Sequence, residues 1–196
     1  MLAAGRGARF GRDKLLVPLG GRPLLAHVLD VVRAARVART LAGGCVVVPA
    51  DRPALLDLVR AAELDPVVNR DPAAGLGESL RRGIAALAAS APAAEPAAAV
   101  ILLGDQPGVR AEVLAELVGV WDRGRVAAVR PRYAAAPDEP GHPMLVDRRL
   151  WSHAARLSAD VGFGPVLAAL GIGVVTVNVP GRNPDVDTEA DLGQLE

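Results

Sequence analysis

The chain has 196 residues, of which about half (51%) are apolar and only 3% are aromatic. This length suits one α/β domain and is short for two, and a core of Ala, Val and Leu is typical of helix-covered parallel sheets. The 22 basic and 22 acidic residues cancel, which removes any global argument for a nucleic-acid partner or a membrane surface. The apolar runs fall short of a membrane span and no apolar signal region is visible, so we expect a cytoplasmic protein.

Apolar residues at three- and four-residue spacing predict helices, and β-branched runs predict strands, in regular alternation. In chain order we expect a helix over residues 24–36, a strand over 46–48, a helix over 54–62, a strand over 66–69, a helix over 78–89, a strand over 100–103, a helix over 111–121, a strand over 126–129, a helix over 165–170 and a strand over 174–179. Asp51 before Pro53 indicates the start of the second helix. This alternation predicts a mainly parallel sheet with helices on both faces.

The chain opens on a glycine-rich, cationic stretch that contains Gly5, Gly7 and Gly11. Backbone N–H groups at such glycines form anion-binding concavities. The spacing matches neither the Rossmann fingerprint nor a Walker loop, so the stretch is a phosphate cradle of another type or a plain turn. The cations Arg9 and Lys14 favour the cradle, because a cationic cluster without a ligand would repel itself.

A second candidate is Asp105, which follows an apolar run and a glycine. Ligands of open parallel sheets bind beyond the carboxyl ends of the strands, where Asp105 is expected to stand. The structural alternative is that Asp105 caps a helix that begins near Val109.

The acidic C-terminal stretch supplies a third candidate. Asp185 and Asp187 point the same way if the segment is extended, while Thr188 and Asp191 have the spacing of a helix cap. Magnesium is usually held by one or two carboxylates together with phosphate oxygens and water. Asp105 and Asp187 together would therefore suffice, if the fold brings the two ends of the chain together.

Two further residues complete the candidates. His142 lies between Gly141 and Pro143 after a polar loop, a place suited to presenting a side chain to a ligand, although a lone histidine is more often structural. Cys45 lies in an apolar run and is interpreted as an inert buried thiol.

The sequence has no G-x-S-x-G stretch and no reactive loop cysteine. Phosphoryl-type transfer needs neither, because it depends on positioning and charge neutralisation.

These stretches resemble, in this order, the MobA-like nucleotidyltransferases, and most closely their molybdenum cofactor cytidylyltransferase branch. Ala3-Ala4-Gly5 together with Gly141-His142-Pro143 indicates the cytidylyl branch. The stretches that carry the resemblance are residues 2–15 (LAAGRGARFGRDKL), 21–25, 69–79, 103–107 (LGDQP), 141–145 and 185–188.

The resemblance implies a three-layer α/β/α Rossmann-like fold with a mixed, mainly parallel sheet, of the nucleotide-diphospho-sugar transferase type. Residues 1–196 would form a single NTP transferase domain. It implies transfer of CMP from CTP to a molybdopterin-type cofactor, with a molybdoenzyme of the hydroxylase type as a further partner. The alternatives are another nucleotide or acceptor (GTP, a sugar phosphate, phospholactate), or a non-catalytic accessory domain that delivers cofactor to a molybdoenzyme.

The resemblance also implies a role for each matching residue. Arg9, Lys14 and Asp105 are the implied catalytic residues, Asp105 and Asp187 the Mg2+ ligands, and Gly141 and His142 the contacts on the pterin side. The implied nucleotide-binding residues are Leu2, Ala3, Ala4, Gly5, Gly7, Arg9, Lys14, Asp71, Gly75 and Ser79.

The start of the chain departs from the family pattern. Relatives carry an apolar strand of about half a dozen residues before Leu-Ala-Ala-Gly, and here only Met1 and Leu2 precede Ala3. We therefore expect a truncated first strand whose neighbours each lose about 1 kcal/mol or more per unpaired ladder group. The residues beyond it are intact, which favours a true start upstream over an impaired protein.

Overall fold

The computed structural model describes residues 1–5, 13–89 and 95–195. The strands of its central sheet form two groups, which the N-terminal residues join. β3 (Cys45–Pro49) pairs in parallel with β4 (Asp65–Asn69). Leu2 then bridges in parallel both to Val47 of β3 and to Leu103, just after β5 (Ala98–Ile101). Met1–Ala3 therefore occupy the place of a strand between β3 and β5.

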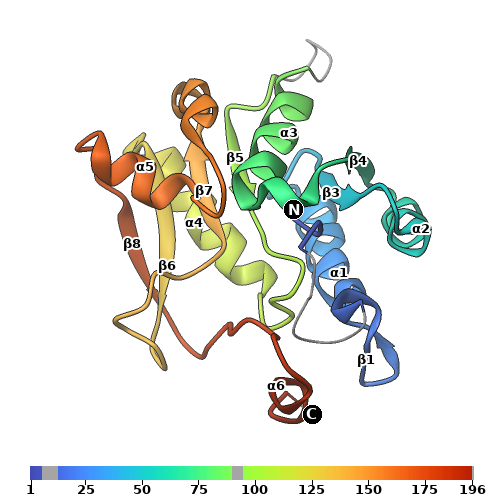
Figure 1. Ribbon diagram of the computed structural model, residues 1–196. Coiled ribbons are helices and arrows are strands. Elements are labelled where there is room, and N and C mark those ends of the chain that lie inside the picture. Colours follow the sequence, from blue (N-terminus) through green and yellow to red (C-terminus); the bar gives the residue numbers. More distant parts are fainter. Residues whose placement is uncertain (6–12, 90–94, 196) are drawn as a thin grey trace.

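The second group has the order β5, β7 (Met144–Asp147), β6 (Ala128–Tyr133) and β8 (Val175–Val179). β7 is antiparallel to both β5 and β6, and β8 is parallel to β6. Figure 1 shows these strands in the left half of the view, with β3 and β4 on the other side of the N-terminus. The sheet is mixed, as the resemblance implies.

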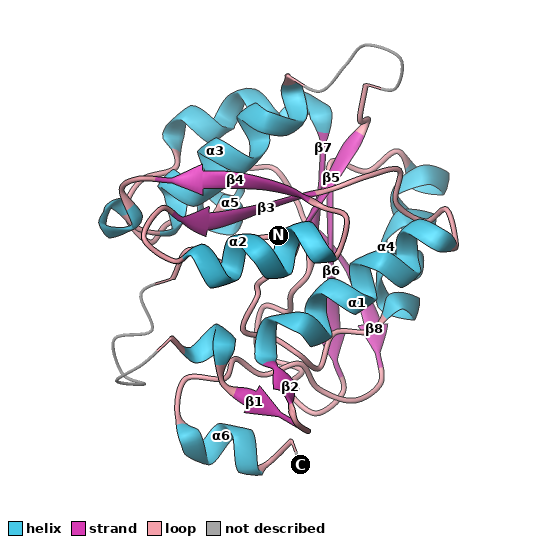
Figure 2. Cartoon of the chain, turned by 90° about the vertical axis from the view of Figure 1, so that its right-hand side faces the viewer, coloured by secondary structure: helices cyan, strands magenta, loops and turns pink. Residues whose placement is uncertain are grey.

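Helices cover both faces of this sheet, because alternate strand residues point to opposite faces. Val46 and Val48 pack into one core with α1 (Leu24–Val37), α2 (Pro53–Ala61) and α4 (Ala111–Gly124). Met144 and Val146 pack into another core with α3 (Leu76–Ala88), the 3-10 helix η5 (Arg148–Arg156) and α5 (Phe163–Ala169). Figure 2 shows β3 and β4 between α2 and α3. The expected three-layer α/β/α architecture is confirmed.

Short elements border the carboxyl ends of the central strands. The 3-10 helix η2 (Lys14–Leu16) leads into a two-stranded hairpin of β1 (Pro18–Leu19) and β2 (Arg22–Pro23). A second short 3-10 helix, η3 (Pro72–Ala74), precedes α3. The last helix, α6 (Glu189–Gly193), begins with the predicted capping box, in which Thr188 and Asp191 bond to each other's backbone.

The ten predicted elements are all present, with ends that shift by a few residues. The prediction missed the β1–β2 hairpin, whose strands have two residues each. It also missed β7 (MLVD), which contains one β-branched residue and so shows no β-branched run. One capping interpretation is wrong. α4 begins at Ala111 after Arg110 without a side-chain cap, so Asp105 does not cap it. α2 begins at Pro53, as the Asp51 and Pro53 pattern indicates, with Arg52 at the N-cap position.

A cavity of about 650 Å³ lies between β3 and β5 on the far side of Met1 from Asp105. Its walls are mainly apolar and include Val67, Ile84 and Val100, together with Cys45. The Met1 ammonium group donates to the Cys45 carbonyl oxygen at 2.8 Å, and burial lowers its pKa. Burial also raises the pKa of the Cys45 thiol, although Cys45 is only partly buried. The cavity therefore lies beside the Met1 end of the short strand segment, between β3 and β5.

An N-terminal extension of about five Val and Ala residues, the length of β3, is expected to stabilise the protein. It would add about three ladder hydrogen bonds and replace a buried ammonium group by an amide. We expect Tm to rise by roughly 5–10 °C, since each bond contributes about 1 kcal/mol and each kcal/mol shifts Tm by about 2–4 °C at this chain length. Alkylation of Cys45 is expected to slow. A Gly-Ser extension of equal length is the control. An equal Tm for both extensions would show that the Val and Ala side chains do not fill the cavity.

Candidate active site

Three segments that are far apart in the sequence meet beyond the carboxyl end of β5. Lys14 opens η2, Asp105 follows β5 and Asp187 precedes α6. The backbone fixes these positions: Gly104 donates its N–H to Leu2 O at 2.8 Å, and Val186 donates to Asp105 O at 2.9 Å. In both views α6 lies on the same side of the molecule as β1 and away from β8, the strand that precedes it (Figures 1 and 2). The expected meeting of the two chain ends is present.

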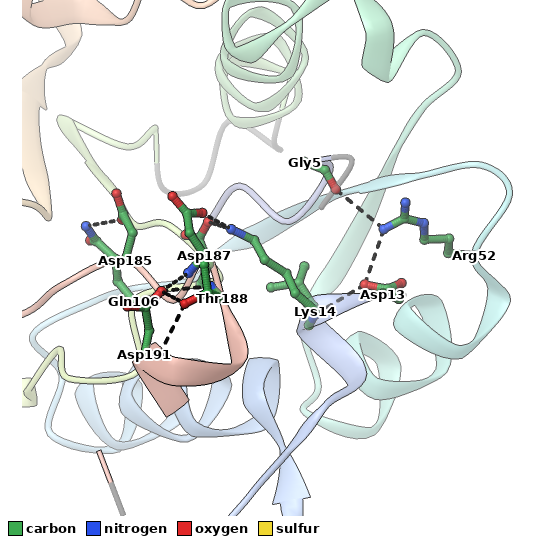
Figure 3. Close-up of polar contacts among 11 residues, drawn as sticks. Gly5, Asp13, Lys14, Arg52, Gln106, Asp185, Asp187, Thr188 and Asp191 are labelled. Atoms are coloured by element: carbon green, nitrogen blue, oxygen red, sulfur yellow. Dashed lines mark hydrogen bonds and ion pairs between the residues drawn. The ribbon is translucent and has the colours of Figure 1, made fainter. Parts of the chain in front are cut away.

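The ammonium group of Lys14 lies between the two carboxylates. Its Nζ is 2.7 Å from Asp105 Oδ2 and 2.8 Å from Asp187 Oδ1, and its side chain is only 10% exposed. Figure 3 shows Lys14 reaching across to Asp187. Burial by itself lowers the pKa of Lys14, but the hydrogen bonds and charges of Asp105 and Asp187 outweigh it and raise the pKa above its ordinary value. Lys14 therefore stays charged at neutral pH.

This arrangement fits a hard divalent cation. Two carboxylates from different segments aim at one point, and the ammonium group there acts as a stand-in cation. Oxygen donors are the ligands that Mg2+ and Mn2+ prefer. Among the described residues no group of three or more His, Cys, Asp or Glu side chains could hold a metal ion. The remaining coordination positions would thus be filled by phosphate oxygens and water.

A buried amide network lies beside the carboxylates, and sequence reasoning missed it. Gln106 donates through Nε2 to Asp185 Oδ1 at 2.8 Å, and Asn183 donates through Nδ2 to Gln106 Oε1 at 3.1 Å and to His142 O at 3.2 Å. Desolvation and the charge of Asp105 raise the pKa of Asp185, against the opposing effect of Gln106. Asp185 and Asp187 therefore have different partners, and the network connects Asp185 to the loop at His142.

The loop at Gly141 and His142 packs tightly on β6. A Cβ atom at Gly141 would lie 2.3 Å from the Pro131 carbonyl oxygen, so only glycine permits this approach. The Tyr133 hydroxyl donates to His142 O at 2.9 Å. His142 Nδ1 is buried without a hydrogen-bond partner, and burial lowers the pKa of the ring. His142 is therefore a neutral imidazole at neutral pH.

The other predicted nucleotide-binding residues form the surrounding frame. Ala3 and Ala4 are buried, and Gly5 accepts from Arg52 Nη1 at 3.4 Å, while Arg52 also pairs with Asp13 at 3.2 Å (Figure 3). Arg9 and Gly7 lie outside the described residues. The structure thus places the residues on either side of the glycine-rich stretch.

A second part of this frame precedes and opens α3. The Asp71 N–H donates to Asn69 Oδ1 at 2.9 Å, and the buried Ser79 hydroxyl accepts from Asn69 Nδ2 at 3.0 Å. Gly75 has a φ of +89°, and a Cβ there would lie 2.5 Å from the backbone of Ala159. Glycine is therefore required where this loop meets the segment after η5.

The structure thus combines a mixed sheet, helices on both of its faces, and a cation between two carboxylates beyond the strand ends. Residues 1–174 match the MobA-like NTP transferase domain, and the chain belongs to this family. Among solved structures, Rv0371c from Mycobacterium tuberculosis H37Rv has 33% identity and a TM-score of 0.79, with 99% of this chain and 93% of that chain covered. The same protein has been solved in complex with manganese.

Two curated relatives share part of the chain. The bifunctional protein GlmU of Leifsonia xyli subsp. xyli is 36% identical over 132 residues, which are 65% of this chain and 25% of that protein. The 2-C-methyl-D-erythritol 4-phosphate cytidylyltransferase of Prochlorococcus marinus is 40% identical over 89 residues, 44% of this chain and 38% of that protein. The chain thus spans between a quarter and two fifths of the length of these relatives.

Among the described residues, no helix is both long and apolar enough to cross a membrane.

The lowered pKa of His142 predicts a specific pH dependence of stability. A base with a depressed folded-state pKa binds its proton more weakly in the folded chain than in the unfolded one. The free energy of unfolding therefore falls as the pH drops below about 6.5, the ordinary histidine pKa, until the folded-state pKa is reached. We expect the Tm of the wild type, relative to that of His142→Gln, to decrease between pH 7.5 and pH 5. His153→Gln is the control. A Tm difference between the wild type and His142→Gln that does not change with pH would contradict the lowered pKa of His142.

Proposed function

We propose that this protein transfers CMP from CTP to the terminal phosphate of a molybdopterin-type cofactor and releases pyrophosphate. The observation that carries the proposal is the convergence of Lys14, Asp105 and Asp187 on one point, within a chain of the MobA-like family. The choice of cytidine rests on Ala3-Ala4-Gly5 and Gly141-His142-Pro143. The cytidylyltransferase among the relatives supports the same nucleotide.

The binding roles follow from the placement of the residues. Asp105 and Asp187 would hold Mg2+, which neutralises phosphate charge when bound. Lys14 and, outside the described residues, Arg9 would hold the triphosphate. The nucleotide is expected to lie over Leu2–Gly5, with Gly7, Asp71, Gly75 and Ser79 around it. Gly141 and His142 would face the acceptor, and the neutral imidazole of His142 adds no charge there.

The transfer requires no general base from the protein. The second pKa of a phosphate monoester lies near 6, so the acceptor phosphate is largely a dianion at neutral pH. One of its oxygens attacks the α-phosphorus of CTP, and the bond from that phosphorus to the bridging oxygen breaks, so that pyrophosphate leaves with the electron pair. The main barrier is repulsion between the two phosphates. Lys14 and Arg9 lower it by placing positive charge where negative charge accumulates.

Lys14→Ala and Asp105→Ala are each expected to lower turnover by about a hundredfold or more, because each removes a charge partner of the transition state. The measurement is pyrophosphate release with CTP, Mg2+ and Mo-molybdopterin. Asp57→Ala, in an exposed pair with Arg60 on α2, is the matched control and should keep full activity. Near-normal turnover in either site variant would reject these roles. Transfer of radiolabelled CMP separates an enzyme from an accessory domain that only delivers cofactor.

Base choice is tested by thermal shift with ATP, CTP, GTP and UTP in the presence of Mg2+. We expect CTP to raise Tm the most, because a ligand that binds only the folded state stabilises it by RT ln(1 + [L]/Kd), which is largest for the tightest-binding nucleotide. UTP is the closest control, since it differs from CTP in the polar groups of the pyrimidine. Strong stabilisation by GTP with none by CTP would reject the cytidylyl choice.

A second candidate function is cytidylyl transfer to a small polyol phosphate. The relative from Prochlorococcus marinus is named for such an acceptor, 2-C-methyl-D-erythritol 4-phosphate. The chemistry is the same, because both acceptors present a phosphate monoester. Replacing Mo-molybdopterin by this phosphate in the pyrophosphate assay distinguishes the two. Pyrophosphate release with the polyol phosphate and none with Mo-molybdopterin would show that the polyol phosphate is the acceptor.

A further inference from the structure

We propose that Lys14 and the divalent cation compete for the same two carboxylates, so that the metal site opens only when a triphosphate draws the Lys14 ammonium away. This inference rests on the proposed function and specifies the order in which that site is filled. It starts from one geometric fact. The Lys14 Nζ lies 2.7 Å from Asp105 and 2.8 Å from Asp187, which is the space in which a bridging cation would have to lie.

Both cations cannot occupy this space together. Mg2+ binds carboxylate oxygens at about 2.1 Å, so an ion shared by Asp105 and Asp187 would lie almost on top of the present Nζ position. Two positive charges at that separation repel strongly in a partly desolvated site. The side chain of Lys14 is 10% exposed, so water screens this repulsion only weakly. Entry of the metal ion therefore requires departure of the ammonium group.

The surroundings indicate that Lys14 is the partner that moves. Asp105 is held through its carbonyl oxygen, which accepts from Val186 at 2.9 Å. Asp187 is held through its N–H, which donates to Asp191 Oδ2 at 3.0 Å, next to the capping box of α6. The backbone of Lys14 is also fixed, because the preceding Asp13 caps η2. The flexible four-carbon stem of Lys14 is the part that can swing.

A bound triphosphate would stabilise the displaced position of the Lys14 ammonium group. The proposed function assigns the triphosphate to Lys14, so its phosphates would lie within reach of the flexible stem. They offer the ammonium group an alternative set of anionic oxygens, and its departure leaves both carboxylates available. The nucleotide then raises the affinity of the site for the metal ion. By linkage, the metal ion raises the affinity for the nucleotide by the same factor. In the protein without nucleotide, Lys14 lowers the affinity of the site for the metal ion.

The test is Mn2+ binding to the full chain without nucleotide. Binding is measured by the decrease in the electron paramagnetic resonance signal of the free ion. Mn2+ is a suitable probe because a solved relative was crystallised with manganese. We expect Lys14→Met, which keeps the length of the side chain and removes its charge, to bind Mn2+ at least about tenfold more tightly than the wild type. Lys14→Gln is a second neutral variant in case Lys14→Met does not fold. Lys14→Arg keeps the charge and should bind as weakly as the wild type.

Arg22→Met is the matched control, since it removes a cation from an exposed carboxylate, Asp30, elsewhere on the surface. It should leave Mn2+ binding unchanged. Equal Mn2+ affinity in the wild type and in both neutral Lys14 variants would overturn the competition and leave the proposed function standing. Asp105→Asn in the Lys14→Met background should abolish the tight binding. If it does not, the metal ion binds elsewhere, and the proposed function fails together with the competition.

Discussion

The ion pairs of Lys14 hold the candidate site together. They join η2, the loop after β5 and the segment before α6, and the partners Lys14 and Asp187 are 173 positions apart in the sequence. Without a cation, Asp105 and Asp187 would face each other as like charges, and this repulsion would oppose the docking of the C-terminal segment. The neighbouring bond from Val186 to Asp105 O and the capping box at Thr188 fix the backbone around them. The competition proposed above gives this site two states, with either the ammonium group or a metal ion between the carboxylates.

The sheet determines where these charges meet. Leu2 bridges β3 and Leu103, and Gly104 donates to Leu2, so the residues that lead into the glycine-rich stretch are bonded directly to the strand end that carries Asp105. A side chain would crowd this contact, because a Cβ at Gly104 would lie 3.0 Å from the Leu25 side chain and 3.2 Å from Leu2 O. The same short strand borders the cavity between β3 and β5. Stability in this part of the sheet and geometry at the site therefore depend on the same few residues.

Sequence patterns predicted what depends on local rules. Asp105 follows an apolar run and a glycine, and the rule for strand ends placed it correctly. Thr188 and Asp191 have the spacing of a cap, and the cap is present. The alternation of helices and strands predicted the layers, because each element carries its own periodicity. The family resemblance added the mixed character of the sheet, which periodicity alone does not reveal.

The rest depends on contacts that no local pattern encodes. The sequence predicted that Lys14 holds phosphate, and the structure places it between two carboxylates from distant segments. Gln106 and Asn183 stand next to predicted residues, but their bond to each other forms only when the loop after β5 meets the segment after β8. β7 (MLVD) contains one β-branched residue, so no β-branched run marks it, and it forms a strand through its pairing with β5 and β6. In each case the determining partner is remote in sequence.

The most direct test of the account is a crystal structure of the protein with CTP and Mn2+, with the metal located by its anomalous scattering. The account predicts a manganese peak between Asp105 and Asp187, with the Lys14 Nζ displaced from both carboxylates and bonded to a phosphate oxygen. A structure in which CTP is bound, Lys14 remains between Asp105 and Asp187, and manganese lies elsewhere would contradict it.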